Sequence, residues 1–265
     1  MRSTALNLPK YKSDKNEYKI LSEYLKYYDS VVGPIYNKEL KILEIGIFKG
    51  GSLELWRDYF PNAQVTGLDR ELRVDIENMD RIRVFEGEQQ DTHMLEYIKD
   101  QVAPDGFDII IDDASHIAEY ARTSFWYLFD HCLKKGGWYI IEDWGTGYWK
   151  DWQDGFHFRK HFLLNQVNRF KHKVSIVIHT GYIRKILSLL KILRLIQRTL
   201  KPKYPSHTYG MVGFVKQLID EQGAADLTQK KMLSAPERRS KFDRTIIVPS
   251  IVFIKKSDLN PTPTL

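Results

Sequence analysis

The sequence has a single cysteine, Cys132, among its 265 residues. It also lacks any run of about 18 uncharged apolar residues, the length that a transmembrane helix needs. One cysteine excludes an intrachain disulfide and is typical of a reducing compartment. The first residues show no apolar stretch of the kind found in secretory signals. We therefore expect a cytoplasmic protein without a membrane span.

Acidic residues are scarce in the second half of the chain. The first 150 residues hold 19 basic and 26 acidic side chains, whereas the last 115 hold 21 basic and 8 acidic ones. A basic region suits an anionic partner such as a membrane surface, a phosphorylated substrate or nucleic acid. A solvated basic surface explains the asymmetry equally well, so charge alone leaves the partner open.

The N-terminal region predicts a helix over residues 13–34. Ser13 or Asp14 is its expected N-cap, and Gly33-Pro34 is its expected end. Four apolar residues recur at helical spacing along it, namely Tyr18, Leu21, Leu25 and Tyr28.

Between residues 40 and 145, five apolar segments alternate with turns and amphipathic helices. The segments are LKILEIGI, AQVTGLDRE, IRVFEGEQQD, FDIIIDDASH and GGWYIIEDWGT. This alternation predicts βαβ units and a parallel sheet, doubly wound through right-handed crossovers. The helix before the fifth segment is expected to include Phe125, Leu128, Phe129 and Leu133.

The C-terminal region predicts one more helix and one or two strands. MVGFVKQLIDEQG has the pattern of a helix, and RTIIVPSIVFIKKS forms either two short strands around Pro249 or one strand with a bulge.

Polar residues end all five predicted parallel strands. They are Glu44 with Gly46, Asp69, Gly87 to Asp91, Asp112 to His116, and Glu142-Asp143. The carboxyl ends of the strands in such a sheet form the edge where ligands bind. In IIIDDASHIAEY, two adjacent carboxylates directly follow a buried run, where both repulsion and burial disfavour their charge. We expect a metal ion or a cationic ligand to compensate.

The turn LEIGIFKGGS lacks the G-x-G-x-x-G spacing of dinucleotide-binding proteins. Its glycines, Gly46, Gly50 and Gly51, allow a tight turn and close approach of a ligand. Asp69 ends the next strand, where an acid typically binds ribose hydroxyls. Together with an acid in the first strand, this arrangement suits a nucleoside that carries an amino acid. Either feature alone is common on protein surfaces.

These segments resemble the class I S-adenosylmethionine-dependent methyltransferases. More narrowly, they are similar to the metal-dependent O-methyltransferases that modify macrolide and other natural-product sugars. The resemblance is carried by KILEIGIFKGGSLELWRDYFPNAQVTGLD, GEQQD, IIDDASH and GGWYIIEDWGTGYW, and it returns in MVGFVKQLIDEQG and SIVFIKK. It implies one α/β methyltransferase domain over 1–265, with an N-terminal helical cap at 1–38. It also implies a doubly wound, Rossmann-like sheet of seven strands with helices on both faces and the last strand antiparallel, and a homo-oligomer.

The resemblance also implies roles for individual residues. Glu44, Gly46 and Ser52 would hold the methionine part of S-adenosyl-L-methionine, and Asp69 its ribose. Gln89, Gln90 and Asp91 would surround the adenine, and Asp112 would also belong to the cofactor site. Asp113, Glu142 and Asp143 would hold Mg²⁺, with His116 as general base. One departure is SDK at Ser13 to Lys15 in place of TDK, without the histidine that often follows it; this leaves the N-terminal part of the substrate pocket open.

The chemistry of these residues agrees with that assignment. Mg²⁺ prefers six oxygen ligands in an octahedron, which three carboxylates, water and two substrate oxygens can supply. No pair of His or Cys residues in the sequence indicates a zinc site. Coordination would lower the pKa of a sugar hydroxyl, and His116 would take its proton. The alternative for His116 is a local hydrogen bond at a helix start.

Other residues near these motifs stay open to two interpretations. Trp144, Tyr148 and Trp149 either stack on a sugar or pack in the core. His93 is expected at the surface, and His157 and His161 either line the substrate pocket or lie on a solvated helix.

The sequence thus predicts a Mg²⁺-dependent O-methyltransferase that acts on a small-molecule glycoside, with lipid-linked and polyketide-linked sugars as candidate acceptors. Methylation of a catechol is one alternative, and an RNA-binding protein or RNA methyltransferase is another. Nucleic acid is the less favoured partner because the basic residues lie among leucines rather than interleaved with aromatics.

The segment 181–205, GYIRKILSLLKILRLIQRTLKPKYP, predicts a basic amphipathic helix. We expect it to cover the domain core, a second subunit or the substrate; contact with an anionic membrane surface is the alternative.

Overall fold

The computed structural model describes residues 18–73, 80–149, 151–155, 210–228 and 238–259. Several predictions from the sequence lie outside these residues: the caps Ser13 and Asp14, the SDK motif, His157, His161 and the segment 181–205.

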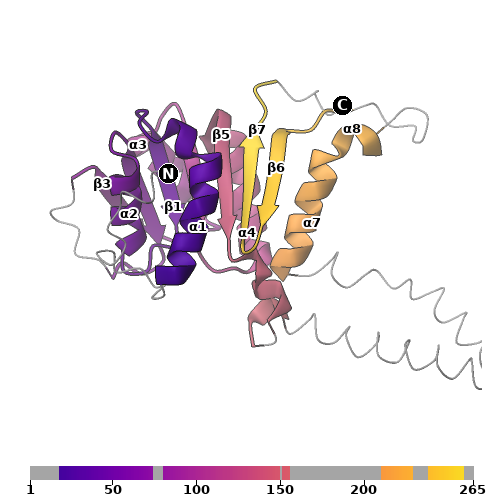
Figure 1. The fold of residues 1–265 in the computed structure, drawn as a ribbon, viewed down its shortest axis with the longest axis horizontal. Coiled ribbons are helices and arrows are strands. Elements are labelled where there is room, and N and C mark those ends of the chain that lie inside the picture. The colour runs from indigo at the N-terminus through magenta and orange to yellow at the C-terminus, as the bar shows by residue number, and fades with distance from the viewer. Residues whose placement is uncertain (1–17, 74–79, 150, 156–209, 229–237, 260–265) are drawn as a thin grey trace, which may run out of the picture.

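The helices and strands follow the predicted order (Figure 1). The strands are β1 (Lys41–Ile45), β2 (Gln64–Asp69), β3 (Ile82–Glu86), β4 (Phe107–Asp112), β5 (Leu133–Glu142), β6 (Phe242–Val248) and β7 (Ile251–Lys256). The α-helices are α1 (Tyr18–Val31), α2 (Gly51–Tyr59), α3 (Thr92–Val102), α4 (Ala118–Tyr127), α7 (Gly210–Gln222) and α8 (Ala224–Leu227). Short helical turns are η3 (Gly33–Ile35), η4 (Leu128–Cys132) and η5 (Trp144–Tyr148).

The strands form one seven-stranded sheet in the order β3-β2-β1-β4-β5-β7-β6. Strands β1 to β5 run parallel, and β7 pairs antiparallel with both β5 and β6. The prediction of a doubly wound, Rossmann-like methyltransferase sheet with an antiparallel last strand is confirmed. Of the two C-terminal alternatives, the pair of short strands is right, with Ser250 in the left-handed region (φ 63°) at the turn.

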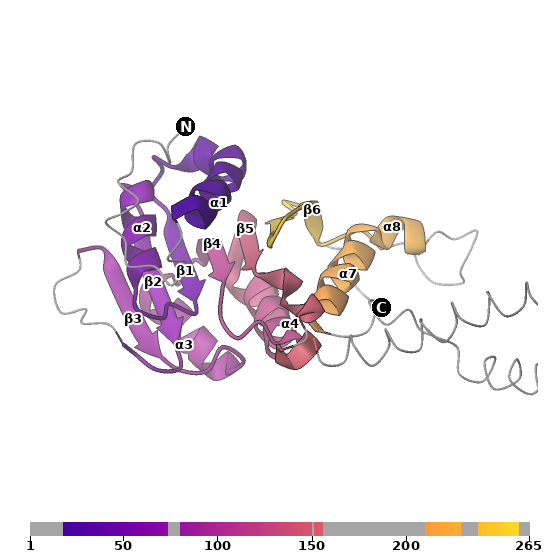
Figure 2. The ribbon, with the colours of Figure 1, turned by 60° about the horizontal axis from the view of Figure 1, so that its bottom comes forward.

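Helices cover both faces of the sheet (Figure 2), and a hydrophobic core lies on each face. Side chains of α1 and α2 pack on one face, and those of α3, α4 and α7 on the other. In β4, Ile109 and Ile111 pack on the side of α1 and α2, whereas Ile110 packs on the side of α3, α4 and α7. The continuous apolar run is therefore explained by burial on both faces, as in other parallel sheets.

The helix predicted to include Leu133 ends earlier, so that prediction was wrong at its C-terminus. The α4 helix gives way to the wide turn η4, and Leu133 is the first residue of β5. Leu133 has an extended backbone (φ −86°, ψ 129°) and pairs with Phe107 of β4, so the sheet takes up this residue. Lys256 Nζ of β7 donates to the carbonyl oxygens of Phe129 and Leu133 at this point.

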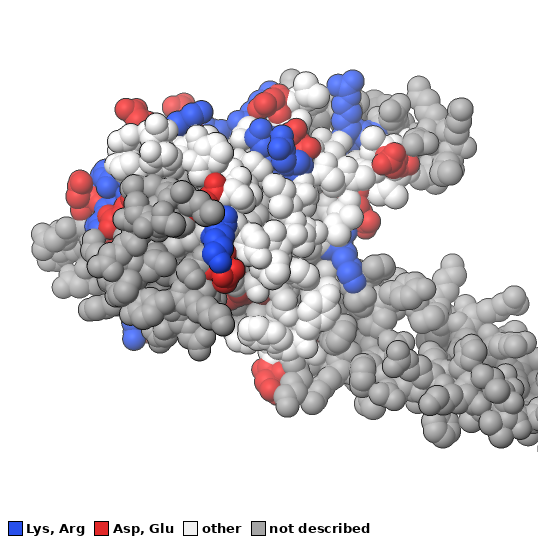
Figure 3. All heavy atoms as spheres, viewed as in Figure 1, with Lys and Arg blue, Asp and Glu red and all other residues white. Residues whose placement is uncertain are grey.

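Most of the basic excess lies outside the described residues, since residues 156–209 contain 12 basic residues and no acidic one. On the face drawn in Figure 3, the Lys and Arg side chains of the described residues are interspersed with Asp and Glu. Within the described part of the chain, no helix has the length and apolarity that a bilayer crossing requires.

Candidate active site

The turn between β1 and α2 depends on glycine. Gly46 has φ 84°, and a Cβ there would lie 2.4 Å from the carbonyl oxygen of Asp113, so no larger residue fits. One carboxylate oxygen of Asp69, Oδ2, accepts hydrogen bonds of 2.9 Å from the backbone N–H groups of Ile47 and Phe48. Asp69 therefore shapes this turn, and its contact with a ribose stays a prediction.

Glu44 is buried at the end of β1 with 2% of its surface exposed. Its Oε2 accepts a hydrogen bond from Ser52 Oγ at 2.9 Å, and its Oε1 accepts one from Trp56 Nε1 at 3.0 Å. The structure thus brings together Glu44 and Ser52, as predicted. Sequence reasoning missed Trp56, although its spacing of four residues from Ser52 places both on one face of α2.

A hydrogen bond between the side chains of Gln89 and Asp112 connects the loop after β3 with the end of β4. Gln89 Nε2 donates to Asp112 Oδ1 at 3.4 Å, and Tyr139 OH donates to Asp112 Oδ2 at 3.2 Å. Burial raises the pKa of the Asp112 carboxyl to about 6, and its hydrogen bonds oppose that rise. Gln89 Oε1 accepts from the backbone N–H of Ser115, which ties the two loops together.

Gln90 and Asp91 differ in their surroundings. Asp91 Oδ1 accepts hydrogen bonds from the backbone N–H groups of His93 and Met94, so it caps the N-terminus of α3. The amide oxygen of Gln90 is buried, and within the described residues it has no hydrogen-bond partner. A buried acceptor of this kind normally binds a donor. His93 is exposed, as predicted.

Asp113, His116 and Asp143 come together at the ends of β4 and β5. One ligand atom from each lies within 4.8 Å of the others, and His116 Nε2 is 3.9 Å from Asp113 Oδ1. His116 and Asp143 both have left-handed backbone angles, φ 51° and 50°. Such strain in residues other than glycine is maintained by the surrounding structure and is typical of functional sites.

Glu142 is not part of that group of three. It is 2% exposed, and its Oε1 accepts a hydrogen bond of 2.5 Å from Tyr28 OH. The neighbouring Asp143 Oδ1 accepts a similar bond of 2.5 Å from Tyr24 OH. The structure therefore brings His116 to Asp113 and Asp143, and the role of Glu142 as a metal ligand stays a prediction.

Tyr24 and Tyr28 were not predicted to belong to the site. Burial raises the pKa of both phenols above the ordinary value, and the hydrogen bond to Asp143 for Tyr24 and the charge of Glu142 for Tyr28 raise it further. The negative charges of Glu44 and Asp113 also raise the pKa of Tyr28. Because α1 is more than 100 residues from β5 in sequence, no local pattern indicates these contacts.

The aromatic residues after β5 separate into two groups. Trp144 donates through Nε1 to the carbonyl oxygen of Val248 and packs against the core. Tyr148 and Trp149, by contrast, are 45% and 56% exposed.

Trp152, which sequence reasoning did not single out, lies against His116. Its ring is 5.8 Å from the imidazole, and its Nε1 donates to the carbonyl oxygen of His116. It also stands perpendicular to the ring of Trp149, with the ring centres 6.4 Å apart. We call this pair, Trp149 and Trp152, the aromatic corner. Asp154 Oδ2 accepts from the backbone N–H of Ala118, which holds the segment against the start of α4.

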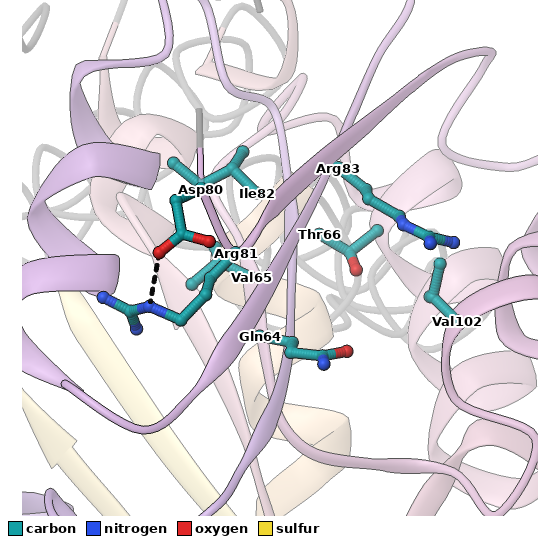
Figure 4. Close-up of a pocket in the computed structure, with 8 residues that line it drawn as sticks. All are labelled: Gln64, Val65, Thr66, Asp80, Arg81, Ile82, Arg83 and Val102. Atoms are coloured by element: carbon teal, nitrogen blue, oxygen red, sulfur yellow. Dashed lines mark ion pairs between the residues drawn. The ribbon is translucent and has the colours of Figure 1, made fainter. Parts of the chain in front are cut away.

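A cavity of about 260 Å³ lies at the opposite edge of the sheet (Figure 4). Gln64 and Ile82, the first residues of β2 and β3, contribute to its lining, together with Arg81 and its ion-pair partner Asp80. None of the predicted site residues lines it.

Comparison with curated proteins finds sugar O-methyltransferases. The chain is 39% identical over 133 residues to mycinamicin VI 2''-O-methyltransferase of Micromonospora griseorubida, covering 48% of this chain and 32% of that protein. It is 40% identical over 133 residues to demethylmacrocin O-methyltransferase of Streptomyces fradiae, covering 48% and 33%. The chain thus spans about a third of the length of these relatives. The resemblance stated from the motifs is confirmed, whereas no family model matches the chain.

A similar solved structure is a MycE methyltransferase of the mycinamycin biosynthetic pathway, in complex with Mg, S-adenosylhomocysteine (SAH) and mycinamycin VI. The TM-score is 0.58 at 26% identity, and the match covers 88% of this chain and 48% of the other. A second crystal structure of that enzyme, with Mg and SAH, matches with a TM-score of 0.57.

Proposed function

We propose that this chain binds S-adenosyl-L-methionine and Mg²⁺ and methylates a hydroxyl group on the sugar of a small-molecule glycoside. The observation that carries the proposal is the group of Asp113, His116 and Asp143, gathered at the end of a parallel sheet beside a glycine turn. The named relatives methylate glycosides, and the MycE structures contain Mg and SAH.

The cofactor site is supported by the residues around the β1–α2 turn. Glu44, already positioned by Ser52 and Trp56, offers a buried negative charge for the amino group of the methionine part. Gly46 leaves room for the ligand to approach the backbone. The buried oxygen of Gln90 is a fitting acceptor for the amino group of adenine, whereas Asp91 already caps α3.

The donor set fits Mg²⁺ because carboxylate oxygens are its preferred protein ligands. Asp113, Glu142 and Asp143 would hold it, and when bound it would lower the pKa of a coordinated hydroxyl. His116, whose Nε2 faces Asp113, accepts the hydroxyl proton. The hydroxyl oxygen forms a bond to the methyl carbon as the carbon–sulfur bond of the cofactor breaks, which leaves SAH.

The aromatic corner supports a ring-shaped acceptor. Trp149 and Trp152 present two perpendicular, partly exposed indoles, and the ring of Trp152 lies next to His116. The apolar face of a pyranose stacks well on such a surface. We assign the corner to the sugar or to the group that carries it.

The test is turnover with a panel of glycosides, S-adenosyl-L-methionine and Mg²⁺, followed by mass spectrometry. We expect a glycoside that gains one methyl group together with an equal amount of SAH. Catechol and RNA serve as the other acceptors in the same assay. Methylation of either one, with no glycoside methylated, would replace the proposed acceptor.

Assembly and membrane contact stay predictions. Light scattering on the purified protein tests the expected homo-oligomer. Co-sedimentation with anionic liposomes tests whether 181–205 contacts a membrane, since such binding requires anionic lipid and weakens with salt.

A further inference from the structure

The α1 helix contacts both carboxylates at the end of β5. Tyr24 and Tyr28 are four residues apart, so their side chains lie on one face of the helix, one turn from each other. Tyr24 OH donates to Asp143 Oδ1 and Tyr28 OH donates to Glu142 Oε1, each at 2.5 Å. The geometry points to a function for this pair: Tyr24 and Tyr28 are positioning residues that orient Asp143 and Glu142 for a divalent cation.

The backbone of Asp143 makes this double contact feasible. Adjacent residues of an extended strand point to opposite faces of a sheet. Asp143 leaves the strand with φ 50°, and its carboxylate meets the same helix face as that of Glu142. The strained residue and the helical spacing of the tyrosines therefore match each other.

The choice of tyrosine matters for the charge of the site. Both bonds have the length of charge-assisted O–H···O⁻ bonds, which are stronger than neutral ones. A phenol fixes the orientation of a carboxylate without cancelling its charge, whereas Lys or Arg in the same place would neutralise it. The pair thus holds two adjacent acids in place and leaves their charge for a cation.

Tyr28 also links the acid pair to the cofactor side of the site. Its ring centre is 4.6 Å from that of Trp56, and Trp56 Nε1 donates to Glu44 Oε1. Phe253 of β7 packs on Tyr28 with its ring centre 5.4 Å away. Replacement by Phe keeps these ring contacts and removes only the hydroxyl.

The test is cation binding by Tyr24→Phe and Tyr28→Phe, measured calorimetrically with Mg²⁺ or Mn²⁺ on the SAH complex without an acceptor. The inference rests on the proposed function for the presence of the cation. Loss of a hydrogen bond to a metal ligand typically weakens metal binding about 10- to 100-fold, and we expect that range. Affinity for SAH should stay unchanged, and activity should recover at high Mg²⁺.

The matched control is Tyr59→Phe. Tyr59 is also a buried tyrosine whose hydroxyl donates to a carboxylate, Asp29 Oδ1 at 2.7 Å, but Asp29 lies outside the acid pair. Its variant should bind the cation like the wild type. Unchanged cation affinity in both Tyr24→Phe and Tyr28→Phe, or an equal loss in Tyr59→Phe, would overturn the inference. A wild-type protein that binds no divalent cation would instead overturn the metal part of the proposed function, and the inference with it.

Discussion

Charged side chains at the starts of the strands include ion pairs, whereas at the ends of the strands Glu44, Asp69, Glu142 and Asp143 accept hydrogen bonds from neutral donors. At the starts, Asp108 accepts hydrogen bonds from Lys134 Nζ at 3.0 Å and from the backbone N–H of Lys41 at 2.7 Å. Arg81 donates to carbonyl oxygens near the end of α2. At this edge, Lys134 offsets the charge of Asp108 and Asp80 offsets that of Arg81.

At the ends of the strands, the donors are hydroxyl, indole, amide and backbone N–H groups. Glu44 accepts from Ser52 and Trp56, and Asp69 accepts from backbone N–H groups. Tyr28 donates a hydrogen bond to Glu142, and Tyr24 donates one to Asp143. These contacts orient negative charge and preserve it for a cation. The cavity of about 260 Å³ lies at the edge formed by the strand starts, away from these carboxylates.

Removal of the metal should have the largest effect. If the carboxylates at the strand ends hold Mg²⁺, EDTA should reduce turnover to background, and excess Mg²⁺ should restore it. Binding of SAH, followed by calorimetry, should persist because the β1–α2 turn does not need the ion. Full turnover in EDTA would remove the metal from the proposal.

His116→Ala should lower kcat by about 10²- to 10⁴-fold, the usual contribution of a general base. Cofactor binding should be unaffected. His131→Ala, which changes a histidine in η4 outside the site, is the control. A kcat near the wild-type value would leave His116 with a structural role only.

Asp69→Ala should weaken SAH binding by about 1–3 kcal/mol, the range for loss of a buried polar partner. The loss would combine a missing ribose contact with a looser turn at Ile47 and Phe48. Calorimetry measures it, with the exposed Asp105→Ala as the control. Equal affinities in the two variants would contradict the role of Asp69.

Arg81→Ala tests the edge of the sheet where the strands start. The carbonyl oxygens of Arg57, Phe60 and Ala63 would lose their shared donor, so we expect the free energy of unfolding to fall by about 1–2 kcal/mol. Denaturant titration measures this fall. Affinity for SAH should stay the same, and a change there would show that the two edges are coupled.

Trp149→Ala should have the smallest effect, a rise in KM for the glycoside that corresponds to about 0.5–1.5 kcal/mol of aromatic contact. The value of kcat should change little. Tyr97→Ala removes a comparably exposed ring on α3 and is the control. Equal KM values in the two variants would remove the aromatic corner from the acceptor site.

The parallel strands and their polar ends were predictable because both depend on local sequence. The apolar runs fix the strands, and a parallel sheet brings their ends to one edge, which places Glu44, Asp69, Asp112 and Asp113 correctly. The cap at Asp91 was also within reach, since Asp before a helix is a common N-cap signal. Asp91 was assigned to the adenine, and its role as the cap of α3 was not considered.

The contacts between distant segments were not predictable from the sequence. The spacing of Tyr24 and Tyr28 is that of any apolar helix face. It does not indicate that the hydroxyl of Tyr24 contacts Asp143 or that the hydroxyl of Tyr28 contacts Glu142. At the end of the helix, Leu133 pairs with Phe107 of β4 and its carbonyl oxygen accepts from Lys256, more than 100 residues later. The aromatic corner likewise depends on the contact of Trp152 with His116, which lies 36 residues earlier in the chain.

The position of β7 has a consequence for folding during synthesis. Strand β5 is complete at Glu142, but its antiparallel neighbour begins at Ile251, 109 residues later. At about 5–20 residues per second, the ribosome needs roughly 5 to 20 s to make the intervening chain. Throughout that interval β5 has an unpaired edge with Tyr139, Ile140 and Ile141 at its centre, and such edges promote association between nascent chains. We therefore expect the nascent chain to be prone to aggregation until the hairpin of β6 and β7 has left the ribosome.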